Sequence, residues 1–364
     1  MKKLYTTPKY KNIHKSHLLK SEKKLHKKSV VTKRIRRELK KKREEHRIEE
    51  TRNNHNTFSL HEFKPTVVAP SDLRLLENTE KCLSFFRDLR SDDYLSRKGL
   101  LKFVILSLKD VTKVDYGAIS ILTAIGDDLK YKGIILRSVL PNDPNSRDFM
   151  IESGYLNNLF DDNGKPFPKT EKSELIFFEK GCGRLSENDS IKISKLVKNV
   201  VGHLTGIEKY CLPIKTIILE ICGNSIEWSG TENKQWLLGV KYDNEKVIFT
   251  VTDVGKGILD SLYRRFDKKL FEFYKSKDEI LKGAFDKKYG STTKEDNRNK
   301  GLPAVNSYFL NGIINNLKVL TNNVILHFDN NDFSREFKKG SPRFKGTFYQ
   351  WEMQKDCLTK IITI

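Results

Sequence analysis

Two segments decide the fold and the chemistry of this chain: ILEICGNSIEW (residues 218–228) and VTDVGKGI (residues 251–258). In the first segment, Glu220 and Asn224 are four residues apart and have isoleucines beside them. A helix would therefore place both polar side chains one above the other on a single face. Such a face is suited to holding a metal-bound phosphate.

The second segment follows a strand-like run, EKVIFTVT (residues 245–252), which ends at Asp253. Gly255 and Gly257 come directly afterwards, where the backbone must turn tightly or approach a ligand closely. A carboxylate at the end of such a strand can accept a hydrogen bond from a base. The rest of the chain is organised around this helix and this turn.

The composition describes a globular protein with one unusual end. The chain has 364 residues, of which 37% are hydrophobic, and this is enough for two or three domains that each bury a core. Its formal net charge is +21, and residues 1–52 carry 20 Lys and Arg against 6 Glu. About two thirds of the excess positive charge therefore lies in this short segment.

Residues 1–57 are predicted to be a disordered basic tail, because they can bury too little apolar surface to offset the entropy of ordering them. The positive charge favours binding to nucleic acid or to another acidic surface through counterion release. A solubilising tail without a specific role explains the same composition. The sequence leaves both interpretations open.

Neither the cysteines nor the hydropathy indicate an extracellular or membrane protein. The five cysteines are scattered, without a C-x-x-C pair or a Cys/His cluster at zinc spacing. No apolar run approaches the roughly 20 residues that span a bilayer, and no signal peptide is recognised. A reduced, cytoplasmic setting without membrane contact is therefore predicted.

Residues 58–172 alternate helical and strand-like segments, which predicts a mixed or parallel α/β sheet. The expected elements, in chain order, are helix 71–89, strand 101–108, helix 118–130, strand 133–139 and helix 146–154. Over roughly residues 60–160, this order around the stretch LKDVTKVDYGAISIL resembles the STAS domain of anti-sigma-factor antagonists. A generic βαβ unit explains the same order.

The resemblance is closest at Asp115, which matches the aspartate of the family's Asp-Ser-Ser-Gly signature. Tyr116 and Gly117 stand where the two serines usually stand, and the second serine is the one that is phosphorylated in the family. The phosphorylation switch is therefore not expected here, and Ser120, one helical turn further, is a weak substitute. The resemblance implies a docking or sensing module.

A linker rich in Pro and Gly at residues 161–174 predicts a domain boundary, so that residues 173–364 form a second α/β domain. Its expected elements are helices 191–204 and 213–228, strands 235–242 and 245–253 joined as a hairpin, a lid-like insertion after residue 257, helix 302–313 and three strands within 317–353. These segments predict a two-layer α/β sandwich with helices on one antiparallel or mixed sheet.

Residues 175–355 resemble the GHKL, or Bergerat, ATP-binding domain of histidine kinases, anti-sigma serine kinases, type II topoisomerases and MutL-type repair proteins. Four landmarks occur in the family's order. They are the Glu-x-x-x-Asn helix (Glu220, Asn224), the Asp-x-Gly-x-Gly turn (Asp253, Gly255, Gly257), the glycine after the lid (Gly301) and the closing Gly-Thr strand (Gly346, Thr347). Each pattern alone is common, whereas the ordered set with a lid-sized insertion is specific.

The resemblance implies that ATP and Mg²⁺ are the ligands. Asp253 would accept a hydrogen bond from the adenine amino group, and Gly255 and Gly257 would let the backbone approach the base. Asn224 would hold Mg²⁺ through its amide oxygen, a hard ligand suited to a hard cation. Thr347 would support Asp253 through its hydroxyl or through a water.

The remaining assignments concern the phosphates. Gly301, at the start of a helix, would present backbone amides and the positive helix end, and Lys300 would add charge. Glu220 is the candidate general base, which would orient a water or an acceptor hydroxyl for attack on the γ-phosphate. A solvated helix carboxylate is the alternative role for Glu220.

Two departures from the family pattern concern the same phosphate site. Asn299 replaces the first glycine of the usual Gly-x-Gly after the lid, and no basic residue follows Asn224 at three or four positions. Lys294 and Arg298 in the lid are candidates to compensate. A conventional histidine kinase is not expected, because His203 lies inside a helix of the domain, where it is assigned to packing or to the surface.

The leading hypothesis is a regulatory ATPase or serine/threonine-kinase-like switch, whose nucleotide state controls docking of the STAS-like domain or of a protein partner. A homodimer is a family-level expectation. The alternative is a nucleotide sensor or adaptor that does not hydrolyse ATP and is tethered to nucleic acid by residues 1–57. A protein kinase that acts on a separate partner is a third hypothesis, and the sequence leaves the three open.

Overall fold

The computed structural model describes residues 66–91, 103–169, 176–183, 185–229, 235–265, 276–286, 301–338 and 340–362. The basic segment 1–57, the larger part of the lid-like insertion and Lys300 lie outside the described residues, as do Lys294, Arg298 and Asn299. The chain divides into two compact units, Met1–Phe63 and Lys64–Ile364, and every described residue belongs to the second. None of the described helices is both long and apolar enough to cross a membrane.

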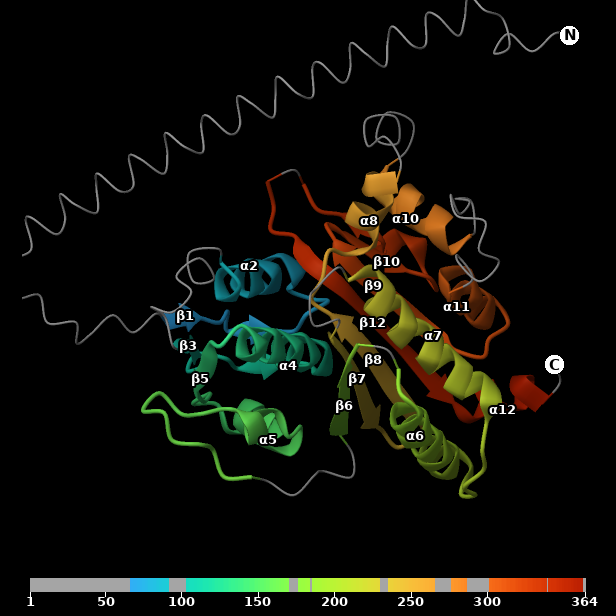
Figure 1. The fold of residues 1–364 in the computed structure, drawn as a ribbon, viewed down its shortest axis with the longest axis horizontal. Coiled ribbons are helices and arrows are strands. Elements are labelled where there is room, and N and C mark those ends of the chain that lie inside the picture. The colour runs from blue at the N-terminus through green and yellow to red at the C-terminus, as the bar shows by residue number, and fades with distance from the viewer. Residues whose placement is uncertain are drawn as a thin grey trace, which may run out of the picture. The chain divides into compact units, whose positions relative to one another are not determined.

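An antiparallel sheet of seven strands runs through the second unit in the order β11-β10-β9-β12-β8-β7-β6 (Figure 1). Its strands are β6 (Ile176–Cys182), β7 (Gln235–Tyr242), β8 (Lys246–Asp253), β9 (Asn315–Asn322), β10 (Val324–His327), β11 (Arg335–Glu336) and β12 (Phe344–Gln354). The hairpin predicted over residues 235–253 is confirmed, because β7 and β8 pair antiparallel with Leu238 opposite Val251.

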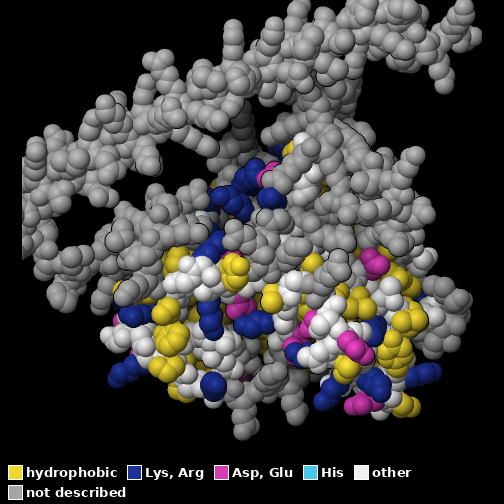
Figure 2. All heavy atoms as spheres, in the orientation of Figure 1, with side chains coloured by type: hydrophobic (Ala, Val, Ile, Leu, Met, Phe, Trp, Pro, Cys, Tyr) yellow, Lys and Arg dark blue, Asp and Glu magenta, His cyan; other side chains and the backbone are white. Residues whose placement is uncertain are grey.

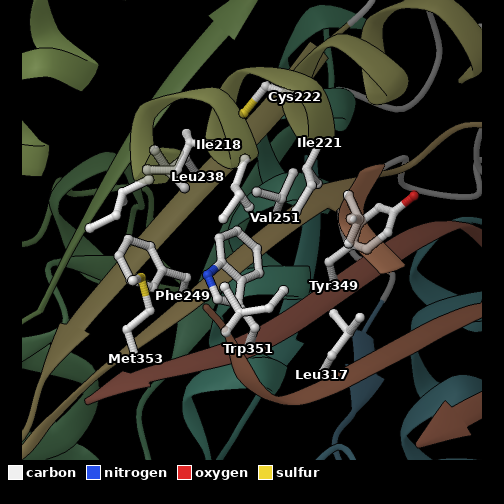
Figure 3. Close-up of a cluster of buried hydrophobic side chains, with 14 of the residues drawn as sticks. Ile218, Ile221, Cys222, Leu238, Phe249, Val251, Leu317, Tyr349, Trp351 and Met353 are labelled. Carbon is white, nitrogen blue, oxygen red and sulfur yellow. The ribbon is translucent and has the colours of Figure 1, made fainter. Parts of the chain in front are cut away.

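Helices cover one face of this sheet. They are α6 (Glu187–Thr205), α7 (Leu212–Trp228), α8 (Ile258–Arg265), α10 (Lys277–Phe285), α11 (Gly301–Leu310) and α12 (Lys355–Ile362). Alternate strand residues, such as Phe249 and Val251 of β8 and Trp351 of β12, point into one hydrophobic cluster with these helices (Figure 3). The rings of Phe249 and Trp351 stack with their centroids 5.1 Å apart.

Local sequence explains where α6 and α7 begin and end. The Ser186 hydroxyl accepts a hydrogen bond from Asp189 N at 3.1 Å, and the Asp189 carboxylate accepts one from Ser186 N at 2.9 Å, which is a capping box. Gly206 ends α6 with a φ of 79°. Pro213 lies in the first turn of α7, where its missing N–H has no helical partner to lose.

Residues 66–169, here called the N-terminal region, pack on the opposite face of the same sheet. They form β1 (Thr66–Val68), β2 (Asp72–Leu73), α2 (Thr79–Leu89), β3 (Phe103–Ser107), β4 (Lys113–Val114), α4 (Tyr116–Tyr131), β5 (Ile135–Val139), α5 (Pro144–Glu152) and a 3-10 turn η2 (Tyr155–Asn158). Strands β1, β3 and β5 make a parallel sheet, as the alternation of segments predicts.

The two regions share a hydrophobic core. Leu237 of β7, Leu320 of β9 and Phe348 of β12 belong to the cluster of the N-terminal region, whereas their neighbours along each strand point to the helices on the other face. The two-layer arrangement predicted for residues 173–364 therefore gains a third layer. Contact within residues 64–364 is continuous, and the linker at 161–174 does not separate independent bodies.

The helix predicted over residues 71–89 begins only at Thr79. Asp72 and Leu73 instead form β2, which pairs parallel with β4. The Asp72 carboxylate binds the Arg74 guanidinium at 2.6 Å, and it also accepts a hydrogen bond from Arg74 N at 3.1 Å. This local hydrogen bonding favours a turn over a helix at the start of the segment.

Candidate functional site

The residues predicted to bind a nucleotide come from four segments that lie far apart in the sequence. Glu220 and Asn224 lie on α7, and Asp253 ends β8 at the turn that leads to α8. Gly301 is the first residue of α11, and Thr347 lies in β12. The fold brings these segments together, because β12 pairs with β8 and α11 packs on α7.

Asp253 is buried, with 4% of its surface exposed. Its Oδ1 accepts a hydrogen bond from Gly255 N at 2.9 Å, and Thr347 lies directly opposite in the paired strand. Burial raises the pKa of Asp253 to about 6, while hydrogen bonds from Gly255 and Thr347 act to lower it. The carboxyl is therefore mostly ionised at pH 7 and can accept a further hydrogen bond there.

The two glycines of the turn are required by close packing against protein atoms. A Cβ at Gly255 would collide with the backbone of Ser229, which follows α7, and Lys256 N donates to Ser229 O at 2.7 Å. Gly257 has a φ of 81°, and a Cβ there would collide with the Asn322 side chain. In this structure the close approach expected at these glycines is made to Ser229 and Asn322.

Sequence reasoning missed Thr321 and Asn322, which end β9 and hold the turn. The Asn322 amide oxygen accepts a hydrogen bond from Leu259 N at 3.1 Å, and its amide nitrogen donates to Lys256 O at 2.8 Å. The Thr321 hydroxyl accepts from Ile258 N at 2.9 Å. Asn322 has a φ of 54°, and an Asn after a strand is a weak signal for such a position.

The amide of Asn224 is closed off by the start of α11. A Cβ at Gly301 would collide with Asn224 Oδ1 and would lie 2.6 Å from Nδ2, so any other residue here would require the Asn224 amide to move. Asn224 Nδ2 is buried and has no hydrogen-bond partner among the residues that the structure describes. Leaving a buried donor unpaired costs about 1 to 3 kcal/mol, so the amide is poised for an acceptor that a ligand can supply.

Glu220 lies one turn before Asn224 on the same helix and is half-buried. The side chain of Tyr308 on α11 is close enough that the charge of Glu220, after burial, raises the pKa of Tyr308. Helix α11 therefore borders both predicted side chains of α7. The assignment of Lys300, which directly precedes this helix, stays a prediction because it lies outside the described residues.

The positions that replace the STAS serines lie inside the contact between the two regions. Asp115 caps α4, accepting hydrogen bonds from Ala118 N at 2.7 Å and Leu75 N at 2.9 Å. A Cβ at Gly117 would lie 3.1 Å from the Phe348 ring. Ser120 is fully buried, and its hydroxyl lies 2.8 Å from that of Thr252. The suggestion that Ser120 substitutes as a phosphorylated hydroxyl is therefore wrong for this conformation.

His203 is exposed on α6, which agrees with its assignment to packing or to the surface. Its Nε2 lies 2.6 Å from the carbonyl oxygen of Asp243, and its ring packs against Tyr242 with the centroids 5.0 Å apart. Both partners belong to the hairpin of β7 and β8. The ring therefore anchors α6 to this hairpin.

A basic surface adjoins the first residues of β12. Arg87, Arg343 and Lys345 are exposed around a cavity of about 320 Å³, which Phe86 of α2 and Phe344 of β12 also line. Figure 2 shows dark-blue Lys and Arg side chains gathered where the chain leads into β12. Arg343 also pairs with Asp260 of α8, next to the turn that follows Asp253.

Comparisons with protein-family models, with curated proteins and with solved structures found no match for this chain. Within the described ranges, no group of three or more His, Cys, Asp or Glu side chains could hold a metal ion. A cation at this site would therefore depend on the Asn224 amide oxygen together with oxygens of its ligand and of water.

Proposed function

We propose that residues 176–362 form a GHKL-type ATP-binding domain, that the N-terminal region is a STAS-like layer docked on it, and that the chain is an ATP- and Mg²⁺-dependent regulatory switch. The observation that supports this best is the contact between Gly301 and Asn224. It joins the landmark helix to the landmark glycine after the lid, and it buries an amide nitrogen that lacks a partner. If the two short motifs occurred by chance, there would be no reason for Asn224 and Gly301 to be in contact in the fold.

The roles follow from the geometry around each side chain. The buried carboxylate of Asp253 accepts the adenine amino group, and Thr347 in the opposite strand supports it. Asn224 offers Oδ1 to Mg²⁺ and Nδ2 to a phosphate oxygen. Asn224 Oδ1 would be the protein group that holds Mg²⁺, which would supply positive charge to the phosphates. Glu220 orients the attacking water or hydroxyl from the same face of α7.

The burial of Ser120 bears on which reaction follows. Its hydroxyl is enclosed between α4 and β8, where it lies 3.1 Å from the hydroxyl of Thr250. A phosphoryl transfer within the chain to this position would require the two regions to separate. The arrangement favours an ATPase, or transfer to a separate protein, over phosphorylation of the chain's own STAS-like signature. A sensor without turnover is the second candidate, favoured by Asn299 after the lid.

The test is ATP binding by calorimetry and phosphate release with Mg²⁺, measured on wild type, Asp253→Asn and Glu220→Ala. We expect Asp253→Asn to abolish binding, because an amide with the wrong polarity replaces the buried acceptor. We expect Glu220→Ala to keep binding and lose turnover. Asp243→Asn, at the far end of the same hairpin and paired with Lys241, is the matched control and should change neither.

Each outcome of this experiment has a defined meaning. Absence of binding by wild type at millimolar ATP with Mg²⁺ would remove the proposal. Binding without turnover in wild type would favour the second candidate, a nucleotide sensor. Equal turnover in wild type and Glu220→Ala would contradict the assignment of Glu220 as the general base. A homodimer is tested separately by light scattering with and without nucleotide. Nucleic-acid binding through residues 1–57 is tested by its salt dependence before and after deletion of that segment.

A further inference from the structure

Arg90, directly after α2, carries a positive charge into the contact between the N-terminal region and the sheet. Its side chain is only 12% exposed. One guanidinium nitrogen donates to Val254 O at 2.7 Å, and the other donates to Lys345 O at 2.7 Å. The guanidinium also lies 3.7 Å from the carboxylate of Asp128 on α4.

The two carbonyl groups that Arg90 binds flank the predicted base-binding carboxyl. Val254 lies between Asp253 and Gly255, so its carbonyl belongs to the turn itself. Lys345 precedes Gly346, where a Cβ would collide with the carbonyl of Asp253. One guanidinium therefore fixes the main chain on both of the paired strands beside Asp253. A planar fork with several donors can do this, whereas an ammonium group cannot hold both carbonyls in the same way.

The charge of Arg90 also acts on Asp253. Burial raises the pKa of Asp253 to about 6, and the positive charge of Arg90 opposes this rise. Burial lowers the pKa of Arg90 itself, whereas the charges of Asp128 and Asp253 raise it. Among the described residues, the charge of Arg90, directly after α2, acts on Asp253, the charge of Asp253 acts on Tyr349 of β12, and the charge of Asp128 on α4 acts on Arg90.

Burying a guanidinium is costly unless its charge and its donors are matched. Here its two Nη atoms donate to Val254 O in the turn after β8 and to Lys345 O in β12, and its charge lies 3.7 Å from Asp128 of α4, which itself pairs with Lys132 at 2.7 Å. Arg90 Nε is buried and has no hydrogen-bond partner among the described residues. Arg90 therefore joins the N-terminal region to the two strands that carry the predicted base site. Arg87, on α2 itself, instead donates to Ser84 and Asp88 of its own helix.

We propose that Arg90 is a positioning residue for nucleotide recognition: it holds the turn at Val254 and the strand at Lys345 so that Asp253 faces the base as an ionised acceptor. Docking of the N-terminal region and nucleotide affinity are coupled through this one side chain. The proposal rests on the proposed function, because it assumes that Asp253 binds the base. It adds the residue through which the N-terminal region controls that binding.

The experiment compares Arg90→Met, Arg90→Lys and the control Arg87→Met in the full chain. ATP affinity with Mg²⁺ is measured by calorimetry from pH 5 to pH 8, together with the thermal unfolding midpoint of each variant. We expect Arg90→Met to weaken binding at least tenfold at pH 7 and to move the pH midpoint of binding upward from about 6, because Asp253 then loses the charge that favours its ionised form. Arg87→Met should match wild type in ATP affinity at pH 7 and in the pH midpoint of binding.

Arg90→Lys separates the contribution of the positive charge from that of the hydrogen bonds to the two carbonyl groups. It also keeps the proposal testable if Arg90→Met fails to fold. The charge remains but the two carbonyls are no longer held together, so affinity should fall while the pH midpoint stays near that of wild type. Variants that fold, melt earlier and keep both the wild-type affinity and the wild-type pH midpoint would overturn the proposal. Failure of wild type itself to bind ATP would instead defeat the proposed function, and with it this inference.

Discussion

The two faces of strand β8 are buried by different chemistry. Toward α6 and α7, β8 presents Phe249 and Val251, and the surrounding cluster consists of hydrophobic side chains (Figure 3). Toward the N-terminal region, the same strand presents Thr250 and Thr252, which are fully buried and lie within hydrogen-bond distance of Ser120 on α4. One strand therefore serves an apolar core on one side and a polar contact on the other.

The difference shows what each contact specifies. Hydrophobic burial stabilises without regard to direction, so the helical face gains free energy from area and shape. Buried hydrogen bonds require particular partners, so the contact with α4 fixes where that helix lies on the sheet. Tyr116 reinforces this position, because its ring stacks on Phe178 at 5.4 Å and its hydroxyl occupies the space that Gly239 leaves open.

The largest expected effect comes from removing one buried ring on each face. Trp351→Ala and Phe348→Ala should each lower the free energy of unfolding by about 3 to 5 kcal/mol, because both side chains are fully buried. Since the two regions share a core, we expect each variant to shift one cooperative transition in urea, followed by circular dichroism. An early separate transition in Phe348→Ala alone would mean that the N-terminal region unfolds by itself.

A smaller loss is expected from Gly117→Ser, which introduces a hydroxyl at a position that the predicted STAS resemblance aligns with a serine. The new Cβ would lie 3.1 Å from the Phe348 ring and 3.2 Å from Leu75, so overpacking should cost about 1 to 3 kcal/mol. Gly126→Ser on the same helix is the control, because a Cβ there meets only Leu136 at 3.6 Å. It should be neutral or slightly stabilising, since a mid-helix glycine is unfavourable by itself. Equal effects of the two substitutions would argue against tight docking at Gly117.

The polar contact can be tested against a polar residue of the other face. Ser120→Ala leaves the buried hydroxyls of Thr250 and Thr252 without this partner and should cost about 1 to 2 kcal/mol. Ser225→Ala on α7 removes a hydroxyl that donates to Ile221 O of its own helix at 3.2 Å, so its cost should stay below about 0.5 kcal/mol. Chemical denaturation without nucleotide measures both. A larger loss for Ser225→Ala would reverse the comparison.

Much of the fold could be predicted because the pattern of apolar and polar residues within each segment indicates its secondary structure. The alternation in residues 235–253 predicts the hairpin, and the periodicity around Glu220 and Asn224 predicts α7, which the structure confirms. The contact of Ser120 with Thr250 could not be predicted, because it joins residues that only tertiary packing brings together. A threonine in a strand is equally typical of a solvent-facing position.

The candidate site divides in the same way. The sequence predicts that the backbone turns tightly or approaches a ligand at Gly255 and Gly257, and in the structure the atoms close to these glycines belong to Ser229 and Asn322. The hydrogen bond from Leu259 N, at the start of α8, to the Asn322 amide oxygen joins residues far apart in the sequence, so no local motif predicts it. The guanidinium of Arg90 reaches the carbonyl groups of Val254 and Lys345 only because the N-terminal region packs on the sheet, so no local pattern predicts this contact.

The smallest predicted effect concerns two buried carboxyls, one from each region. Burial raises the pKa of Asp115, at the cap of α4, and that of Asp253 to about 6, whereas an unfolded aspartate titrates near 3.9. The folded state therefore holds these protons more tightly than the unfolded state. The stability that they contribute is fully present below about pH 4 and is lost as the pH rises through about 6.

The two carboxyls should respond differently to nucleotide. Without ATP, the free energy of unfolding of wild type should decrease between pH 5 and pH 7. Replacing either carboxyl with Asn should make this decrease smaller by about 1 kcal/mol, as measured by urea unfolding at each pH. With saturating ATP and Mg²⁺, Asp253 is held ionised by the base, so the pH dependence that it causes should disappear. Asp115 accepts hydrogen bonds from Ala118 N and Leu75 N of the N-terminal region, so its contribution should stay. If ATP instead suppressed the contribution of Asp115 and left that of Asp253, the nucleotide would bind against the N-terminal region and not at the turn after β8.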